Sequence, residues 1–397
     1  MMNEKILNLI GRKNEFFIED IVKYENQLKK IVSNSSFLVI GGAGSIGQAV
    51  TKEIFKRKPK LLYVVDINEN NLTELVRDIR SSLGYIEGEF RTFALDVGSI
   101  QYDAFINTYN KFNYVLNLSA LKHVRSEEDP FTLMRMIDVN ILNTIKTINQ
   151  SIKSGVKKYF CVSTDKATNP VNMMGASKYI MEMFLMKRSV DIDVSTARFA
   201  NVAFSDGSLL YGFNNRIEKK QPIAVPGDVK RYFLTPKESG ELCLMSCIFG
   251  ENRDIFFPKF DKNKHLISLL DIAIKYLEEK GYDAHICNTE DEARQLIKIL
   301  PEKKKWPCLI TKSDTTGEKE EEEFFTNKEK INMDRFKNLG IIKTDLVHDL
   351  TLLNNFQETI EKLKLSNWNK KSIVDEFFKL IPEFKYHDNK KYLDGKM

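Results

Sequence analysis

The stretch FLVIGGAGSIGQAVTKEIFKR, residues 37–57, decides the fold of this chain. A short apolar run leads into a glycine turn, and a helical pattern follows directly. Glycines at this junction allow a tight turn and let the backbone approach a pyrophosphate, while the helix start offers free N–H groups and a favourable dipole. We therefore predict a dinucleotide site; a glycine turn without a ligand is the alternative. Its predicted residues are Gly41, Ser45, Ile46 and the remaining glycines of the G-x-x-G-x-x-G spacing, Gly44 and Gly47.

Acidic residues follow the next two apolar runs. Asp66 ends the run LLYVVD, 19 residues after Gly47. A carboxylate there accepts hydrogen bonds from the adenosine ribose hydroxyls and repels a 2′-phosphate, so the sequence favours NAD over NADP. Asp96 follows the run TFAL and is expected to meet the adenine amine; the alternative is an aspartate that caps a turn.

Apolar runs and helical patterns alternate through the first half of the chain. Further predicted strands are FRTFALD, YVLNLSAL, KKYFCVSTD and VSTARFANVAF. Strands separated by helices of ten or more residues indicate a parallel sheet with helices on both faces. We predict an α/β fold with a Rossmann-type doubly wound parallel sheet, a smaller C-terminal α/β domain and extra terminal helices. The predicted parts are an N-terminal helical extension at 1–34, an NAD-binding domain at 35–205, a substrate region at 206–330 and a C-terminal helical extension at 331–397.

Composition narrows the class of protein. The chain has 397 residues, of which 42% are hydrophobic, and no run approaches the ~20 apolar residues of a membrane span. The N-terminus lacks the apolar core of a signal peptide, and the net charge of +5 is spread without a basic arm for nucleic acid. The five cysteines lack metal-type spacing, and Cys243 and Cys247 are interpreted as helix core, so no metal is predicted. A reduced, cytoplasmic protein fits best.

A second stretch, STDKATNPVNMMGASK at 163–178, carries candidate chemistry. Thr164, Asp165 and Lys166 end an apolar strand, and ligands of open α/β sheets bind at the carboxyl ends of strands. An acid beside an amine can provide general acid and base catalysis. A lysine base must be neutral, and we expect desolvation or nearby positive charge to make it so. In the alternative interpretation, Asp165 caps a turn and Lys166 is solvated.

The three-glycine spacing resembles that of extended short-chain dehydrogenase/reductases. In that family, NLSALKHV (117–124), with Ser119 and Ala120, corresponds to the loop under the nicotinamide ribose, DVNILNT (138–144) to the Asn-bearing helix, and Lys178 to the catalytic lysine. The family's tyrosine, four residues before this lysine, is replaced here by Met174.

The pattern STDKA-NP-N-MGA-K resembles the CapD-like polysaccharide-biosynthesis branch, the N-acetylglucosamine 4,6-dehydratases, and most closely those of the legionaminic acid pathway. The likeness extends through RFANVAFSDGS (198–208), KRYFLTPKESGEL (230–242) and TGEKEEEEFF (316–325). It implies that Lys166 removes the C5 proton of an NDP-GlcNAc while Asp165 protonates the leaving C6 hydroxyl, and that Met174 marks retention at C5. Thr164, a water or Lys178 accepts the C4 hydroxyl proton in the earlier step, in which NAD⁺ takes hydride from C4, and the choice between UDP and GDP stays open.

The same resemblance implies the substrate contacts and the assembly. Asn201 is expected at the diphosphate, Arg231 at the nucleotide phosphates, and Lys122 and His123 near the sugar, although a structural role for His123 is equally consistent. The helices at 130–152 and 174–188 are expected to form the subunit interface of a homo-oligomer. The rival functions are an NDP-sugar epimerase and a silent sensor of NAD or nucleotide sugar.

Overall fold

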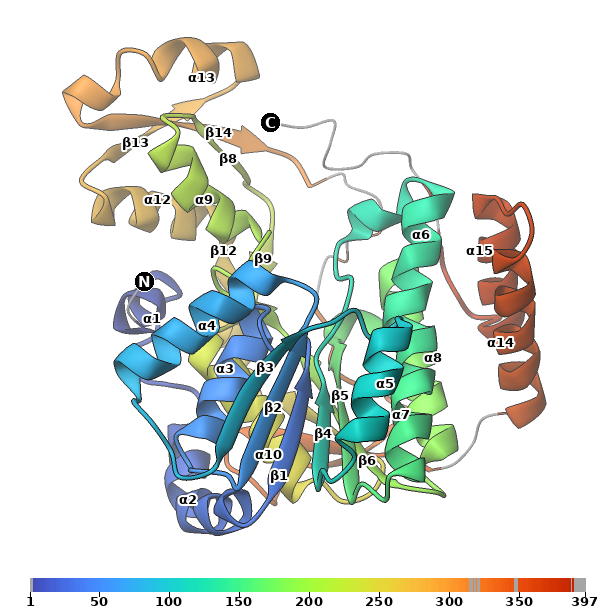
Figure 1. The fold of residues 1–397 in the computed structure, drawn as a ribbon. Helices are drawn as coiled ribbons and strands as arrows, with labels where there is room; N and C mark the ends of the chain where they lie inside the picture. The colour runs from blue at the N-terminus through green and yellow to red at the C-terminus, as the bar shows by residue number, and fades with distance from the viewer. Residues whose placement is uncertain are drawn as a thin grey trace.

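The computed structural model describes residues 3–313, 317, 319, 322–345, 349–386 and 388. Its main sheet has nine strands in the order β15-β16-β11-β6-β5-β4-β1-β2-β3. Figure 1 labels the strands β1 to β6 of this sheet. The seven strands from β11 to β3 are parallel, and β16 and β15 are antiparallel additions at one edge. The order 3-2-1-4-5-6 is that of a doubly wound Rossmann sheet, which confirms the predicted fold class. The strands are β1 Ser36–Ile40, β2 Leu61–Asp66, β3 Glu89–Ala94, β4 Tyr114–Asn117, β5 Lys158–Thr164, β6 Asp193–Phe199, β11 Asp254–Pro258, β15 Lys330–Asn332 and β16 Leu339–Lys343.

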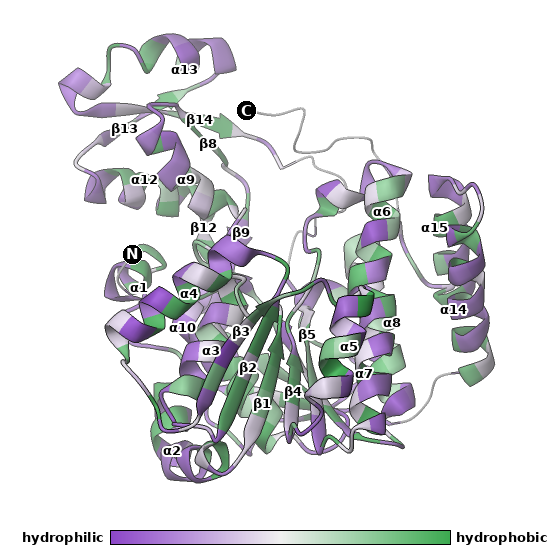
Figure 2. Ribbon diagram, in the orientation of Figure 1, coloured by the Kyte–Doolittle hydropathy of each residue, from purple (hydrophilic) through white to green (hydrophobic). Residues whose placement is uncertain are grey.

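Helices cover both faces of the sheet, which is why its central strands are apolar throughout (Figure 2). One face packs against α2, α3, α4 and α10, and the other against α5, α7 and α8. The helices of these layers are α2 Ile18–Ser33, α3 Ser45–Phe55, α4 Glu69–Ser82, α5 Ile100–Thr108, α7 Asn143–Lys153, α8 Met173–Arg188 and α10 Pro236–Phe249.

The small domain is built on a parallel three-stranded sheet in the order β13-β14-β8. Its core also takes in Ile6 and Leu9 from the first helix, so the N-terminus packs against this domain. The elements are α1 Asn3–Leu9, α9 Leu209–Glu218, β8 Ile223–Pro226, α11 Lys262–His265, α12 Leu269–Glu279, β13 Asp283–Cys287, α13 Glu290–Leu296 and β14 Lys305–Thr311. Two short pairings, β7 Asn201–Val202 with β10 Phe233–Leu234 and β9 Lys230–Arg231 with β12 Ile267–Ser268, join the domains.

The region 331–397 differs from the sequence expectation of a purely helical extension. Its first part forms β15 and β16, and β16 pairs with β11 along the register Ile255↔Ile342. β11 itself was not among the predicted strands. Burial explains the difference, because the short apolar runs at 254–258 and 339–343 fill the sheet edge, and five-residue runs carry no helical or strand periodicity.

The last two described helices form an antiparallel hairpin on the outside of the molecule (Figure 1). They are α14 Leu350–Lys364 and α15 Lys370–Leu380, and they cover α8 and α6 Pro130–Ile137. Leu353, Phe356 and Phe377 pack with Leu133 and Phe184 in one apolar cluster. None of the helices in the described part of the chain has the length and apolarity that crossing a membrane requires.

Candidate active site

The carboxyl ends of β1, β2, β4 and β5 meet at one edge of the sheet. The chain order reverses between β1 and β4, and open α/β sheets bind ligands at such a switch point. The predicted glycine turn, the Ser119 loop and the acid–base triplet follow β1, β4 and β5, so the fold brings these predicted residues to the same edge.

The glycine turn is shaped by close backbone approaches. Gly41 has φ of +70°, and a Cβ there would lie 2.6 Å from the backbone N of Ser119. A Cβ on Gly47 would lie 2.1 Å from the carbonyl O of Gly41. A Cβ on Gly44 would meet only that same oxygen, at 3.6 Å, so this side of the turn has room for a ligand. The turn therefore fits a pyrophosphate at the start of α3.

Asp66 is the last residue of β2, and Asp96 follows β3. Asp66 accepts hydrogen bonds from the backbone N–H of Ala43 and of Asn68, both at 2.9 Å, and each carboxylate oxygen keeps a second lone pair for a ribose hydroxyl. Asp96 accepts from the Gly98 N–H at 2.8 Å and pairs with Arg135 at 3.2 Å. The structure thus shows the turn-capping role of Asp96, and its contact with adenine stays a prediction.

The loop after β4 is fastened to α8 through one asparagine. Asn140, in a π-helical turn at Asp138–Leu142, accepts from the Leu121 N–H and donates to the Leu121 carbonyl, both at 3.0 Å. Its amide also donates to Ser177 Oγ at 2.9 Å. The Ser119–Ala120 loop and the helix that carries Lys178 are therefore held in fixed relation.

Lys178 is buried, and burial lowers the pKa of its ammonium. In the described part of the chain, its hydrogen-bond contact is the Met181 thioether at 3.3 Å, which is a weak acceptor. The ammonium therefore keeps donors for a hydroxyl-bearing ligand.

Met174 is 4% exposed and belongs to the cluster formed with the C-terminal helices. Its backbone N–H donates to Glu127 Oε1 at 2.9 Å. Burial raises the pKa of Glu127 to about 7, although the backbone N–H groups of Met174 and Met173 oppose the shift. The thioether of Met174 can neither give nor take a proton, so this position is packed rather than chemically active.

The acid–base triplet forms a compact group at the end of β5. Asp165 is 3% exposed and accepts from Thr164 Oγ1 at 2.8 Å. Lys166 is half-buried, and its Nζ lies 3.4 Å from Asp165 Oδ1. The ammonium and the carboxylate are thus in contact without a bridging residue.

A segment between β14 and β15 passes close to this triplet. We call residues 317–325 the crossing segment; Gly317, Lys319 and 322–325 are described, whereas Thr316, Glu318, Glu320 and Glu321 of the predicted TGEKEEEEFF motif lie outside the described residues. Asn172 Nδ2 donates to the Gly317 carbonyl at 2.7 Å, and Lys319 Nζ donates to the Thr168 carbonyl. The segment is therefore anchored on Thr168 and Asn172, which lie in the stretch that leads into α8.

Glu322 of the crossing segment is the site residue that the sequence did not single out. Its Oε2 accepts from the Tyr232 N–H at 2.7 Å, and its Oε1 accepts from the Asn201 amide. Burial and the nearby Asp165 raise its pKa to about 7, while Lys166 opposes the shift. The one sequence signal was the resemblance of the acidic run, which did not indicate a particular glutamate.

The charge on Lys166 differs from the sequence expectation of a neutral amine. Burial lowers its pKa, but attraction to Asp165 and Glu322 outweighs burial, so the pKa is raised. The reason is that two carboxylates surround the ammonium, whereas the expectation invoked nearby positive charge. The two carboxylates therefore favour the charged form of Lys166.

Asn201 and Arg231 lie beside the triplet, and both donate hydrogen bonds to the crossing segment. Asn201 also donates to the Tyr232 carbonyl at 3.3 Å, and Arg231 donates to the carbonyl of Lys319 at 3.0 Å. Their predicted contacts with phosphate stay predictions.

Lys122 and His123 meet a loop that reaches the glycine turn. Lys122 Nζ donates to Ser205 Oγ at 3.3 Å, and the Asp206 N–H donates to Ser45 Oγ at 2.8 Å. Burial lowers the pKa of both Lys122 and His123. A Cβ on Gly207 would lie 2.9 Å from His123 Nε2, so the loop and this imidazole are in close contact.

One group among the described residues brings three possible metal ligands together. His285, Cys287 and Glu292 have ligand atoms within 4.8 Å of one another. Glu292 accepts from the Asn288 N–H at 2.8 Å, which closes the start of α13. Because this carboxylate already has a helix-capping role in the small domain, we assign no metal to the group.

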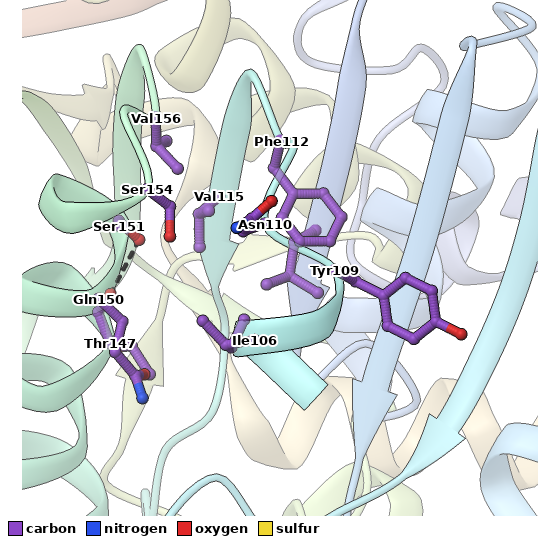
Figure 3. A pocket seen from close by; sticks show the side chains of 11 residues that line it. Ile106, Tyr109, Asn110, Phe112, Val115, Thr147, Gln150, Ser151, Ser154 and Val156 are labelled. Carbon is purple, nitrogen blue, oxygen red and sulfur yellow. Dashed lines mark hydrogen bonds between the residues drawn. The ribbon is translucent and has the colours of Figure 1, made fainter. Parts of the chain in front are cut away.

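A recess at the opposite edge of the sheet is unrelated to this chemistry (Figure 3). It is lined by Ile106, Phe112, Val115 and Val156, which lie near the amino ends of β4 and β5. Polar side chains, among them Asn110, Thr147 and Gln150, complete the lining, and the recess lies between α5 and α7, away from the candidate site.

Comparisons with known proteins match most of the chain. A family model described as "Polysaccharide biosynthesis protein" matches residues 37–343. A protein of Methanocaldococcus jannaschii described as an uncharacterized membrane protein is 30% identical over 306 residues, which are 75% of this chain and 87% of that protein. The capsular polysaccharide biosynthesis protein CapD of Staphylococcus aureus is 28% identical over 351 residues, 86% of this chain and 54% of CapD. The chain thus spans about half the length of CapD.

Further similarities concern epimerases and solved structures. The UDP-glucose 4-epimerase of Rickettsia rickettsii is 25% identical over 345 residues, 83% of this chain and 94% of that enzyme. The X-ray structure of Pen from Bacillus thuringiensis superposes with a TM-score of 0.64 at 24% identity, covering 79% of this chain and 89% of Pen. DesIV of Streptomyces venezuelae, a dTDP-glucose 4,6-dehydratase with NAD and TYD bound, gives 0.53 at 15% identity, covering 70% and 85%. At these identities the structural likenesses show the fold alone.

Proposed function

The chain belongs to the polysaccharide biosynthesis protein family, and from that premise we propose that it modifies a nucleotide sugar, as a C5-retaining NDP-N-acetylglucosamine 4,6-dehydratase. The product is an NDP-2-acetamido-2,6-dideoxy-4-hexulose, of use in surface sugars of the legionaminic acid type. The observation that carries the proposal is the contact between Asp165 and Lys166 at the carboxyl end of β5, with a methionine at position 174.

The cofactor of the proposal is NAD, and the residues present fit it. The glycine turn leaves room beside Gly44, Asp66 keeps lone pairs for the ribose, and Lys178 keeps ammonium donors. The relative named DesIV was solved with NAD bound. Bound NAD supplies a reversible hydride acceptor for C4 and C6 of the sugar, so no external reductant is needed.

The residues of the chain supply the proton transfers. Oxidation at C4 acidifies the C5 proton, and the elimination of water then needs an acceptor at C5 and a donor at the C6 oxygen. Asp165 and Lys166 are placed to handle these protons, with Thr164 bonded to Asp165. Asn201, Arg231, Lys122 and His123 are proposed to surround the nucleotide sugar.

An epimerase is the second candidate, favoured by the likeness to UDP-glucose 4-epimerases. Incubation of the purified protein with UDP-GlcNAc and with GDP-GlcNAc, without reductant, separates the two by mass and proton NMR. Loss of one water with a new C6 methyl group supports the dehydratase and identifies the nucleotide. An isomer of unchanged mass supports the epimerase, and unchanged sugars despite bound NAD contradict both.

A further inference from the structure

We infer that Arg12 is a positioning residue for the part of the candidate site that binds the nucleotide sugar; the inference rests on the proposed function, because it concerns that ligand. Arg12 lies between α1 and α2, and we call residues 11–17 the N-terminal linker. The linker precedes the part of the chain that the family model matches, which begins at residue 37. Its contacts nevertheless reach a strand that borders the site.

The guanidinium of Arg12 joins the linker to β10 and to the start of α10. Its two terminal nitrogens donate to the two carboxylate oxygens of Glu238, at 2.8 Å and 2.6 Å, and Nη2 also donates to the Phe233 carbonyl at 3.2 Å. Glu238 is fully buried, and its Oε2 accepts from the Thr235 N–H at 2.8 Å. Arginine suits this place because its planar fork binds a carboxylate through two bonds and keeps donors for a third acceptor. One side chain of the linker therefore holds both ends of the stretch 233–238.

Aromatic contacts provide a second link. Phe16 is buried, and the centroids of its ring and that of Phe260 are 4.6 Å apart. Phe260 in turn stacks on Tyr232, with 5.0 Å between the ring centroids and an interplanar angle of 1°. The Phe16 N–H donates to Glu238 Oε1 at 2.6 Å, so the same carboxylate binds both Arg12 and Phe16. The linker thus supports β10 and the residue before it through two separate contacts.

The supported strand lies among the residues proposed to meet the nucleotide sugar. Arg231 comes two residues before Phe233, and Phe233 pairs with Asn201 of β7. Asn201 also donates to the Tyr232 carbonyl at 3.3 Å. A shift of β10 would therefore move Asn201 and Arg231 together, whereas the glycine turn follows β1 and would stay in place. Loss of Arg12 is expected to weaken binding of the sugar without weakening binding of NAD.

Arg12→Met tests the inference, with Arg57→Met as the matched control. Arg57 also ties the N-terminal extension to the main domain, because it is buried and pairs with Glu25 of α2 at 2.5 Å and with Glu53 at 2.8 Å. In calorimetry, we expect Arg12→Met to bind UDP-GlcNAc or GDP-GlcNAc, whichever the wild type prefers, at least about fivefold more weakly. Its affinity for NAD should stay within about twofold of wild type, and Arg57→Met should keep both affinities within that range.

Arg12→Lys shows whether the fork itself is needed. A lysine ammonium can pair with Glu238 but lacks the fork that reaches Phe233 as well, so this variant should fold and bind the sugar more weakly than wild type. Wild-type affinity for the sugar in Arg12→Met, or in Arg12→Lys if Arg12→Met does not fold, overturns the inference. Equal losses of sugar and NAD affinity also overturn it, because Arg12 would then only stabilise the fold. A wild type that binds the sugar nucleotide without removing water refutes the proposed dehydratase instead, so the two failures are distinguishable.

Discussion

Arg198 of β6 offers the sharpest test of how the crossing segment is held. Its guanidinium is 2% exposed and binds Glu182 of α8 through two hydrogen bonds, of 3.1 Å and 2.8 Å. It also donates to the Phe324 carbonyl at 3.0 Å and pairs with Glu329 at 3.0 Å. Replacement by methionine removes all four contacts and leaves the carboxylate of Glu182, which is 3% exposed, without its cation.

The expected cost of Arg198→Met is about 3–5 kcal/mol, the range for breaking one side of a buried ion pair. That is a large share of the ~5–15 kcal/mol by which a domain is stable. Urea unfolding should show a midpoint lowered by on the order of 1 M. The control is Arg188→Met at the end of α8. Its pair with Asp191 at 3.5 Å is partly exposed, so this change should alter stability by less than about 1 kcal/mol.

A double variant decides the reason for the loss. In Arg198→Met/Glu182→Leu no charge of this pair is left buried, so the double variant should be more stable than the sum of the single losses by about 0.5–3 kcal/mol. Additive losses, or a loss of less than about 1 kcal/mol in Arg198→Met, would refute the reasoning.

Three further predictions follow from other parts of the structure. Gly47→Ala places a Cβ 2.1 Å from the Gly41 oxygen and should weaken NAD binding by about tenfold or more, measured by calorimetry. The control Gly212→Ala, which has open space at its Cβ, should bind NAD as the wild type does. Equal affinities of the two variants would contradict the described shape of the turn. Burial holds the pKa of Glu127 at about 7 in the folded protein, above its ordinary 4.5, so the stability that its neutral form contributes is full below pH 4.5 and is lost as the pH rises to 7. Glu127→Gln should remove this pH dependence of the free energy of unfolding and should stabilise the protein by up to about 3 kcal/mol at pH 8, measured by urea unfolding. An unchanged pH dependence would mean that another group causes it. Phe377 is fully buried, and Phe377→Ala should destabilise the C-terminal hairpin by about 3–5 kcal/mol. Hydrogen exchange should become faster in α14 while β1 to β6 stay protected. Equal changes in exchange throughout would mean that the hairpin and the sheet unfold together.

Local sequence patterns were sufficient to predict the Rossmann core. The glycine turn after β1 and the aspartate after β2 are signals carried within a few residues, because backbone approach and strand ends are local. The strands β11 and β16 lack such signals: their apolar runs are short and pair with each other across 80 residues or more of sequence, so only the completed sheet selects them.

The residues of the candidate site could be predicted from the sequence, but their charge states could not. Asp165 and Lys166 are neighbours in the sequence, and their contact follows directly. The raised pKa of Lys166 depends on Asp165 and also on Glu322, which lies more than 150 residues further along the chain. A charge environment assembled by tertiary contacts cannot be obtained from spacing, and this is why a neutral lysine was expected.

The C-terminal hairpin has a consequence for assembly. The helices at 130–152 and 174–188 were expected to form a subunit interface, yet α14 and α15 bury apolar side chains of α6 and α8 within one chain. A bundle closed by its own chain is held at an effective concentration that dilution does not change. Its integrity is therefore independent of protein concentration. Subunits that associate through this side must meet the outer surface of the hairpin, which exposes Leu350, Leu352 and Phe378 among polar and charged residues, instead of the core beneath it.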